Sequence, residues 1–235
     1  MTRNLSLALL CVTFAWSVGG CADPTENMVK VPAAAPKPTT DTPAPSPAEN
    51  TAATIIPSAT PSAAASAPAG ALPIALDGSK VDFVGSKVTG KHVGGFKTFS
   101  GFTELAPDGK ALAKINLEIA MDSTWSDNEK LTGHLKAPDF FDVAKYPKST
   151  FTSTEIKAGG EKGATHTITG NLTLHGVTKS ISIPATIDVK DGGVTISSEF
   201  ALNRKDFGIA YTGMTNDLIR DEVGIKMVVK APKKA

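Results

Sequence analysis

The segment ALAKINLEIAM, residues 111–121, alternates between apolar and polar side chains over most of its length. Ile115 and Ile119 fall on one face of an extended chain, and Lys114 and Glu118 fall on the other. A period of two residues predicts a β-strand with one buried face and one solvated face. This pattern decides the fold class, because it recurs through the C-terminal part of the chain.

Seven further strands are predicted from similar patterns. The alternation is clear at 179–190, 194–203 and 223–230, and less regular at 80–88, 95–105, 148–157 and 165–174. Turn sequences such as Asp191-Gly192-Gly193 connect neighbouring strands as hairpins. Eight antiparallel strands predict an all-β fold, and eight is the number at which an up-and-down, lipocalin-like barrel closes around one small ligand. A two-sheet sandwich fits the same periodicity.

Residues 126–147 interrupt this pattern between the third and fourth predicted strands. We expect a short helical insertion there, with Ser126 as the N-cap and Glu129 completing a capping box. A second short helix would carry Phe140 and Phe141. Such an insertion would cover one mouth of a barrel and add aromatic side chains to its interior.

Composition excludes several classes of function. The net charge is +1 with 20% charged residues, which does not indicate a broad basic surface for nucleic acid. The two cysteines, Cys11 and Cys21, both lie near the N-terminus, so the rest of the chain has no disulfide framework, cysteine nucleophile or Cys-x-x-Cys zinc site. The histidines lack metal-site spacing, and we predict no catalytic residue, no metal and no cofactor.

The N-terminus is typical of an exported protein. Residues 1–20 combine Arg3 with an apolar run, as a secretory signal peptide does. Their end, followed by Cys21, resembles the lipobox of bacterial lipoproteins, which implies lipid attachment at Cys21. A plain signal peptide with a chance cysteine is the alternative. The expected location is the bacterial cell envelope, lipid-anchored and facing the periplasm, and Ala22 after the cysteine favours the outer membrane.

The next segment, residues 21–71, differs sharply in composition. It holds ten of the sixteen prolines, many alanines and serines, and no aromatic residue. Such a composition buries too little apolar surface to offset the entropy lost on ordering, so we expect a disordered tether. The folded domain is then expected over residues 72–235.

Three segments of this domain resemble a known family. GHLKAPDFFDVAKYPKSTF (133–151), GNLTLHGVTKSISIP (170–184) and NRKDFGIAY (203–211) occur in the order and at the spacing of the YceI-like family of bacterial periplasmic, lipocalin-like proteins. The resemblance implies an eight-stranded antiparallel barrel that encloses a long isoprenoid or acyl chain. Where family members often carry a histidine-serine pair, this chain has Gly85-Ser86-Lys87, so a contact made by that histidine is not carried over.

Large aromatic side chains are the candidate ligand-binding residues. In a ligand-filled barrel the same side chains form the core and the wall of the pocket. The residues predicted to contact the ligand are Phe83, Phe96, Phe99, Trp125, Phe140, Phe141, Phe151 and Phe200. The expected function is that of a lipid-anchored carrier for a long-chain isoprenoid or acyl lipid, and the sequence leaves a homodimer open.

Other interpretations stay open at this point. His175 precedes Gly176 between two predicted strands, which favours a structural role at a hairpin corner over contact with a ligand head group or catalysis. A structural surface module with a solidly packed barrel would hold no ligand. A lipid-acting enzyme would need His175 or the pair Asp139 and Asp142 as its acid-base groups.

Overall fold

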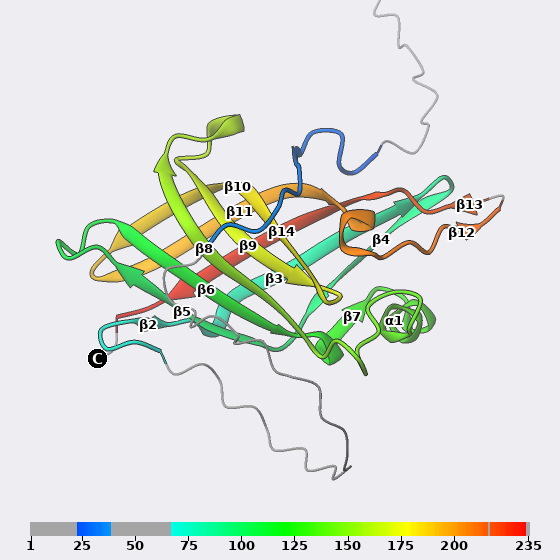
Figure 1. The fold of residues 1–235 in the computed structure, drawn as a ribbon, viewed down its shortest axis with the longest axis horizontal. Coiled ribbons are helices and arrows are strands. Elements are labelled where there is room, and N and C mark those ends of the chain that lie inside the picture. Colours follow the sequence, from blue (N-terminus) through cyan, green and yellow to red (C-terminus); the bar gives the residue numbers. More distant parts are fainter. Residues whose placement is uncertain (1–22, 39–66, 216, 234–235) are drawn as a thin grey trace, which may run out of the picture.

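β-Strands form most of the part of the chain that the computed structural model describes, residues 23–38, 67–215 and 217–233 (Figure 1). One α-helix, α1 (Glu129–Lys136), lies among them, with 3-10 turns at Met121–Ser123, Glu161–Gly163 and Arg204–Phe207. The strands are β1 (Val29–Val31), β2 (Leu72–Pro73), β3 (Ala75–Lys87), β4 (Gly90–Phe96), β5 (Phe99–Leu105), β6 (Leu112–Ala120), β7 (Thr124–Ser126), β8 (Lys148–Ala158), β9 (His166–Leu174), β10 (Val177–Lys190), β11 (Gly193–Asn203), β12 (Gly213–Met214), β13 (Asp217–Leu218) and β14 (Glu222–Ala231).

The long strands form one strongly curled sheet in the order β5-β6-β8-β9-β10-β11-β14-β3-β4. Only Lys97 and Thr98 separate β4 from β5, so both ends of this ladder belong to one bent segment. With β4 and β5 taken as that single segment, the barrel has the eight antiparallel strands that the sequence predicts. The all-β barrel fold is therefore confirmed, with small additional strands at its edges.

The bend between β4 and β5 splits the strand that we predicted at 95–105. Ser123 holds the bend: its hydroxyl accepts a hydrogen bond from the Thr98 N–H at 3.0 Å, and its carbonyl accepts one from the Lys97 N–H at 3.2 Å. One half of the segment can thereby pair with β3 while the other pairs with β6.

The core lies inside the curled sheet. Ile115, Ile168, Ile196 and Val229 come from four different strands and are fully buried. In β6 the apolar face predicted from residues 111–121 is the inner one, since Leu117 is also buried.

An N-terminal strap, residues 23–38, fills a gap in the barrel wall. The β10–β11 ladder runs only from Thr186 to Lys190, and beyond it the two strands separate. In that gap β1 pairs in parallel with Phe200–Leu202 of β11, and Ala34 forms a bridge to Ser180 of β10. In Figure 1 the strap is the blue segment that runs across the barrel wall.

We predicted that residues 21–71 form a disordered tether, and this prediction was wrong for residues 23–38, which form the strap. Val31 is 5% exposed and packs in the barrel core, and the separated strands offer backbone groups for β1 to bond. These long-range contacts outweigh the disorder-promoting composition of the segment. The predicted signal peptide, Cys21 and residues 39–66 lie outside the described residues.

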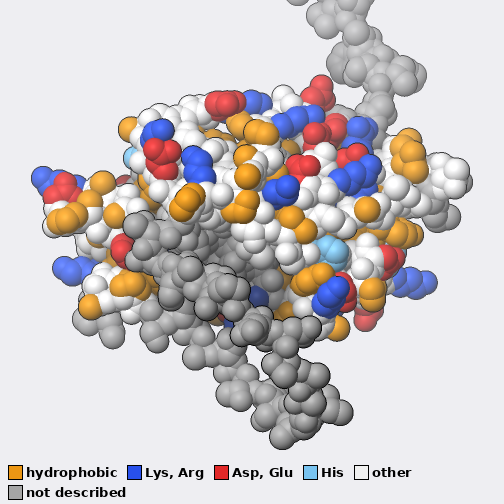
Figure 2. Space-filling model, in the orientation of Figure 1, with side chains coloured by type: hydrophobic (Ala, Val, Ile, Leu, Met, Phe, Trp, Pro, Cys, Tyr) orange, Lys and Arg blue, Asp and Glu red, His pale blue; other side chains and the backbone are white. Residues whose placement is uncertain are grey.

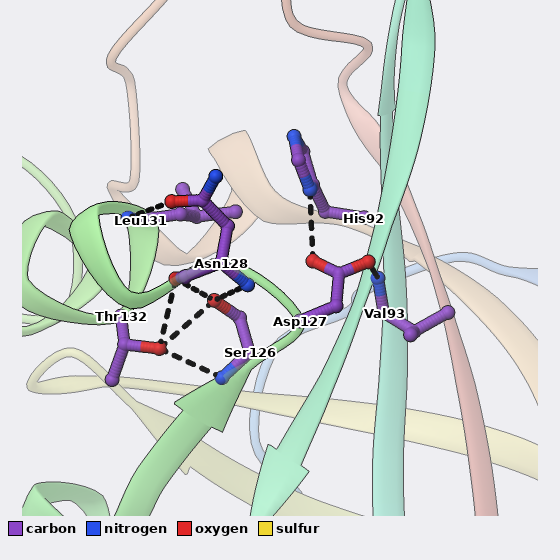
Figure 3. A network of polar contacts seen from close by, with 7 residues as sticks. All are labelled: His92, Val93, Ser126, Asp127, Asn128, Leu131 and Thr132. Atoms are coloured by element: carbon purple, nitrogen blue, oxygen red, sulfur yellow. Dashed lines mark hydrogen bonds and ion pairs between the residues drawn. The ribbon is translucent and has the colours of Figure 1, made fainter.

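The predicted helical insertion between the third and fourth strands is present as α1, but its N-cap differs. Asn128 caps the helix, because its side-chain oxygen accepts a hydrogen bond from the Leu131 N–H at 3.0 Å. Ser126, our predicted N-cap, instead contacts the Thr132 hydroxyl at 2.9 Å (Figure 3). Among the described residues, α1 is too short and too polar to span a membrane, and no other α-helix is present.

The second short helix predicted around Phe140 and Phe141 is absent from this described segment, which forms turns instead. The chain folds back on the end of α1, where the Phe141 N–H donates to the Leu135 carbonyl at 3.0 Å. Leu135, Phe140 and Ile209 thereby form a second small core beside the barrel.

Candidate functional site

A cavity of about 390 Å³ lies inside the barrel and reaches the segment around α1. Its volume lies within the range of pockets that bind small molecules. Aliphatic side chains from strands all around the barrel form much of the wall, including Val81, Leu117, Ile119, Leu172, Ile181, Ile183, Ile225 and Met227. The barrel is therefore hollow rather than solidly packed.

Six of the eight predicted aromatic residues line this cavity: Phe83, Phe96, Phe140, Phe141, Phe151 and Phe200. Phe83, Phe96 and Phe141 form a cluster with ring centroids 5.8 to 6.4 Å apart. Such tilted and edge-on contacts are favourable geometries for aromatic pairs. The cluster joins the barrel strands to the segment after α1, as the position of the insertion predicted.

The other two predicted residues do not line the cavity. Phe99 is buried, at 5% exposure, but it packs in the core away from the cavity. Trp125 pairs with Gly95 in the β4–β7 ladder. A Cβ on Gly95 would lie 2.5 Å from Asp82 Oδ1 and 3.0 Å from Trp125 Nε1, so the side chains of Asp82 and Trp125 lie on the same face of the sheet. Asp82 stands between inward-facing neighbours in β3, so Trp125 lies on the outer face.

Four basic side chains also line the cavity, and the sequence analysis did not identify them as parts of one site. Each is paired with a carboxylate. The pairs are Lys87 with Asp217, His92 with Asp127 at 2.8 Å, His134 with Asp139 at 2.6 Å, and Arg204 with Asp221 at 3.4 Å. No single-sequence pattern links these partners, because only His134 and Asp139 lie within a few residues of each other in the chain.

Arg204 holds the loops beside the cavity together. Its side chain is 4% exposed, and its Nη1 donates to the Ile209 carbonyl at 2.7 Å. The same guanidinium donates to the carbonyls of Arg220 at 3.1 Å and Ile219 at 3.3 Å. Burial lowers the pKa of Arg204, and Asp221 opposes that effect. Its donors are thus used within the protein.

Three of the paired aspartates, Asp217, Asp139 and Asp127, have lowered pKa values and keep their negative charge at neutral pH. The hydrogen bond from Lys87 lowers the pKa of Asp217, and the hydrogen bond with His134 lowers the pKa of Asp139. For Asp127, burial raises the pKa, but the hydrogen bonds from the Val93 N–H at 3.1 Å and from His92 outweigh it (Figure 3). The site therefore carries carboxylates beside its cations.

Gly85 leaves open space in the cavity wall. A Cβ added to Gly85 would meet nothing within 4 Å, so there is open space beside this residue. The Ser86 side chain is buried, and its Oγ has no hydrogen-bond partner. Gly85 faces the cavity next to Lys87, whereas the Ser86 side chain shares the face of Asp82 in the alternation of β3.

His175 has the structural role that its sequence context favours. His175 and Gly176 both have positive φ values, 51° and 73°, as the two central residues of a tight hairpin turn between β9 and β10. Its Nδ1 lies 3.2 Å from the Phe207 carbonyl oxygen, and its ring packs edge-on to Tyr146. His175 is thus a hairpin corner that does not line the cavity.

The aspartates Asp139 and Asp142 do not form an acid-base pair. Asp139 contacts His134, whereas Asp142 lies in a turn with a φ of 45°. Within the described ranges, no group of three His, Cys, Asp or Glu side chains could hold a metal ion. On the face of the molecule shown in Figure 2, acidic and basic side chains are interspersed.

Related sequences cover much of the barrel. A UPF0312 protein of Pseudomonas putida strain W619 is 38% identical over 142 residues, which cover 57% of this chain and 72% of that protein. A UPF0312 protein of Pseudomonas savastanoi pv. phaseolicola is 38% identical over 143 residues, covering 58% of this chain and 73% of its own length.

Solved structures share the fold. Burkholderia cenocepacia BcnA is 25% identical and superposes with a TM-score of 0.60 over 68% of this chain and 99% of its own. A polyisoprenoid binding domain from Saccharophagus degradans is 18% identical, with a TM-score of 0.55 over 68% of this chain and 98% of that domain. The model of the YceI-like domain matches residues 74–231. This chain therefore belongs to the YceI-like family.

Proposed function

We propose that the protein binds a long apolar molecule, a polyisoprenoid or a long acyl chain, inside its barrel. The observation that carries this proposal is the cavity of about 390 Å³ walled by aliphatic and aromatic side chains. Each methylene group moved from water into such a wall contributes about 0.8 kcal/mol, before the costs of ordering the ligand. The Saccharophagus degradans neighbour, described as a polyisoprenoid binding domain, supports the same ligand class.

Binding without chemical conversion fits the wall better than catalysis does. An activated hydroxyl nucleophile needs a base within hydrogen-bond reach. Among the described residues that line the cavity, no hydroxyl hydrogen-bonds a histidine, and the Ser149 hydroxyl donates to the Thr173 carbonyl instead. The protein would therefore hold or carry its ligand unchanged.

The matched glycines Gly85 and Gly90 provide a test. Both lie in the β3–β4 hairpin, and a Cβ on either meets nothing within 4 Å, but only Gly85 lines the cavity. Gly85→Trp would place an indole in the space that the ligand occupies, whereas Gly90→Trp would not. We expect mass spectrometry of organic extracts to find a stoichiometric lipid in the wild type and in Gly90→Trp, and much less in Gly85→Trp.

Two outcomes would count against the proposal. Wild-type protein that stays empty after exposure to host lipids would favour a structural module. Equal loading of both folded variants would show that the extracted lipid sits elsewhere.

We further propose that the barrel is anchored in the bacterial cell envelope through a lipid on Cys21, facing the periplasm from the outer membrane. The signal-like segment of residues 1–20 before this cysteine supports the proposal. Labelled fatty acid fed to expressing cells should enter the wild type and not Cys21→Ser, and only the wild type should fractionate with outer membranes. Equal labelling of both proteins would refute attachment at Cys21.

A further inference from the structure

One end of the barrel carries exposed apolar side chains, Val88, Val93 and Leu218, which we call the apolar tip. Their exposed fractions are 61%, 45% and 50%. Val88 lies in the turn between β3 and β4, and its N–H donates to the Leu218 carbonyl in β13 at 3.3 Å. Val93 follows in β4. Figure 1 shows the β3–β4 turn and β13 at the same end of the barrel.

The cavity reaches the surface beside the apolar tip. Each tip residue directly follows a cavity-lining residue in the chain, namely Lys87, His92 or Asp217. The side chains of Lys87 and His92 are both 37% exposed. Of the described turns at the opposite end, residues 106–111, 159–165 and 191–192, none contributes to the lining. The mouth of the cavity therefore lies at the tip.

The N-terminal strap begins at this end as well. Asp23 Oδ2 lies 3.2 Å from Arg220 Nη1. The Arg220 N–H donates to the Ser86 carbonyl at 2.9 Å, two residues before Val88, and Leu218 precedes Arg220 by two residues. The start of the strap is thus fastened to the segments that carry the tip.

The position of Cys21 indicates which partner covers the tip. Cys21 precedes Asp23 by two residues, and two residues span at most about 7 Å. The proline-rich residues 39–66 follow the strap in the chain, so they do not separate Cys21 from the barrel. A lipid on Cys21 would therefore hold this end of the barrel, and not the opposite one, close to the bilayer.

The side chains of the tip also suit a bilayer surface. Contiguous exposed apolar side chains mark contacts with a partner or a membrane. The carboxylate of Asp217 contacts Lys87 and accepts hydrogen bonds from the Thr89 hydroxyl and N–H, so its charge is compensated. Lys91 lies between Val88 and Val93 and is exposed, as a cation that faces lipid phosphates would be.

We propose that the apolar tip docks onto the phospholipid bilayer that holds the Cys21 lipid, so that the mouth of the cavity faces the membrane. This inference rests on the proposed lipid attachment. A long apolar chain would then pass between bilayer and cavity with less of its surface exposed to water than if the mouth faced the periplasm.

Quenchers carried by lipids measure which end of the barrel touches the bilayer. Val88→Cys and Leu76→Cys each replace an exposed apolar residue, at opposite ends of β3 and about 40 Å apart along the strand. With residues 1–20 removed and a lipid on the Cys21 sulfur, the introduced cysteine is the only thiol of the chain.

The lipidated protein, purified from membranes and labelled with a fluorophore, is reconstituted into vesicles of phosphatidylethanolamine and phosphatidylglycerol that contain a spin-labelled lipid. We expect strong quenching of the fluorophore at position 88. The fluorophore at position 76 should be as bright as in vesicles without the spin label.

Charge substitutions separate docking by the tip from tethering by the lipid alone. With the fluorophore on Val93→Cys, Leu218→Asp should shift the balance from docked to undocked protein about tenfold, which corresponds to about 1.4 kcal/mol, because it removes a buried leucine from the contact. Leu76→Asp makes the same change at the opposite end and should leave the quenching unchanged. Both leucines are about half exposed, so neither change disturbs the core.

Each contrary result has its own meaning. A protein that does not float with the vesicles, and whose Cys21 still reacts with the fluorophore, would overturn the proposed attachment and the inference with it. Equal quenching at positions 76 and 88 in a floating protein would overturn the docking and leave the attachment intact. Quenching that Leu218→Asp does not reduce would overturn docking by the tip, because the anchor alone would then position the barrel. Fluorophores at position 88 that quench one another, but are not quenched by the lipid, would place a second copy of this chain on the tip instead.

Discussion

Ala34 and Ser180 exchange two backbone hydrogen bonds, at 2.8 Å and 2.9 Å, and thereby join the N-terminal strap to β10. The strap also bonds to Asn171 of β9, which accepts from the Lys37 N–H at 2.9 Å and donates to the Lys37 carbonyl at 2.6 Å. Together with β1, these contacts close the gap between β10 and β11. The strap is thus part of the barrel wall.

Ala34→Pro should destabilise the barrel, because proline has no N–H to donate to the Ser180 carbonyl. Loss of one hydrogen bond and an unpaired carbonyl predict a decrease of about 1–3 kcal/mol in the free energy of unfolding, measured with urea. Ala35→Pro is the control, since Ala35 is exposed and outside the bridge. Equal stability of wild type and Ala34→Pro would show that the strap contributes nothing to the wall.

The strap also marks a limit of prediction from this sequence. Strands such as β6 were predictable because alternation is a local pattern that can be read within about ten residues. Val29 and Val31 instead pair with residues near position 200, and Val31 is followed by Pro32 and three alanines. The composition of the segment favoured disorder, and nothing local indicated the gap that it fills.

The residues of the candidate site were likewise predictable only in part. Phe151 and Phe200 were predicted in the wall because apolar positions on alternating strands point inward. Trp125 was wrongly placed there, because a three-residue strand is too short for its inner face to be identified from periodicity. Arg204 and its carbonyl partners were missed, since the pairs form only when residues 204–221 fold beside the cavity.

Ligand affinity should depend on chain length at a fixed head group. The wall is apolar, and each methylene buried against it contributes about 0.8 kcal/mol. Removing one isoprene unit from an alcohol that fills the cavity should weaken binding at least about tenfold, even after a large discount for ordering costs. Calorimetric titration of a homologous series would measure this. Affinity that is constant across short and long chains would place the chain outside the cavity.

The ion pair of Lys87 and Asp217 should stabilise the folded protein at every pH except strongly acidic pH. Because its folded-state pKa is lowered, Asp217 contributes stability above its ordinary pKa of about 3.9, and that contribution is lost as the pH falls through the folded-state value. The difference in urea midpoint between wild type and Asp217→Asn should be constant above about pH 5, should shrink as the pH falls below about 4, and should disappear only below the lowered folded-state pKa of Asp217. Other carboxyl groups titrate in both proteins, so their effect drops out of the difference between the two midpoints. A difference that persists at low pH would therefore exclude the ion pair as its cause.

Replacing Arg204 should destabilise the loops that border the cavity. Arg204→Met would leave the carbonyls of Ile209, Ile219 and Arg220 without their donor, and the predicted loss is about 2–4 kcal/mol in the free energy of unfolding. Arg204→Lys should recover only part of it, because an ammonium group does not reproduce the planar fork that reaches these carbonyls.

Lys205→Met is the control for charge in the same region. Lys205 contacts Asp221 at 2.9 Å but is 45% exposed, so its removal should cost less than about 1 kcal/mol. Hydrogen exchange adds a local reading: in Arg204→Met the amides near Ile209 and Ile219 should lose protection before those of the central strands. Equal effects of Arg204→Met and Lys205→Met on stability would mean that Arg204 acts only as a surface charge, and full recovery by Arg204→Lys would mean that its fork geometry is dispensable.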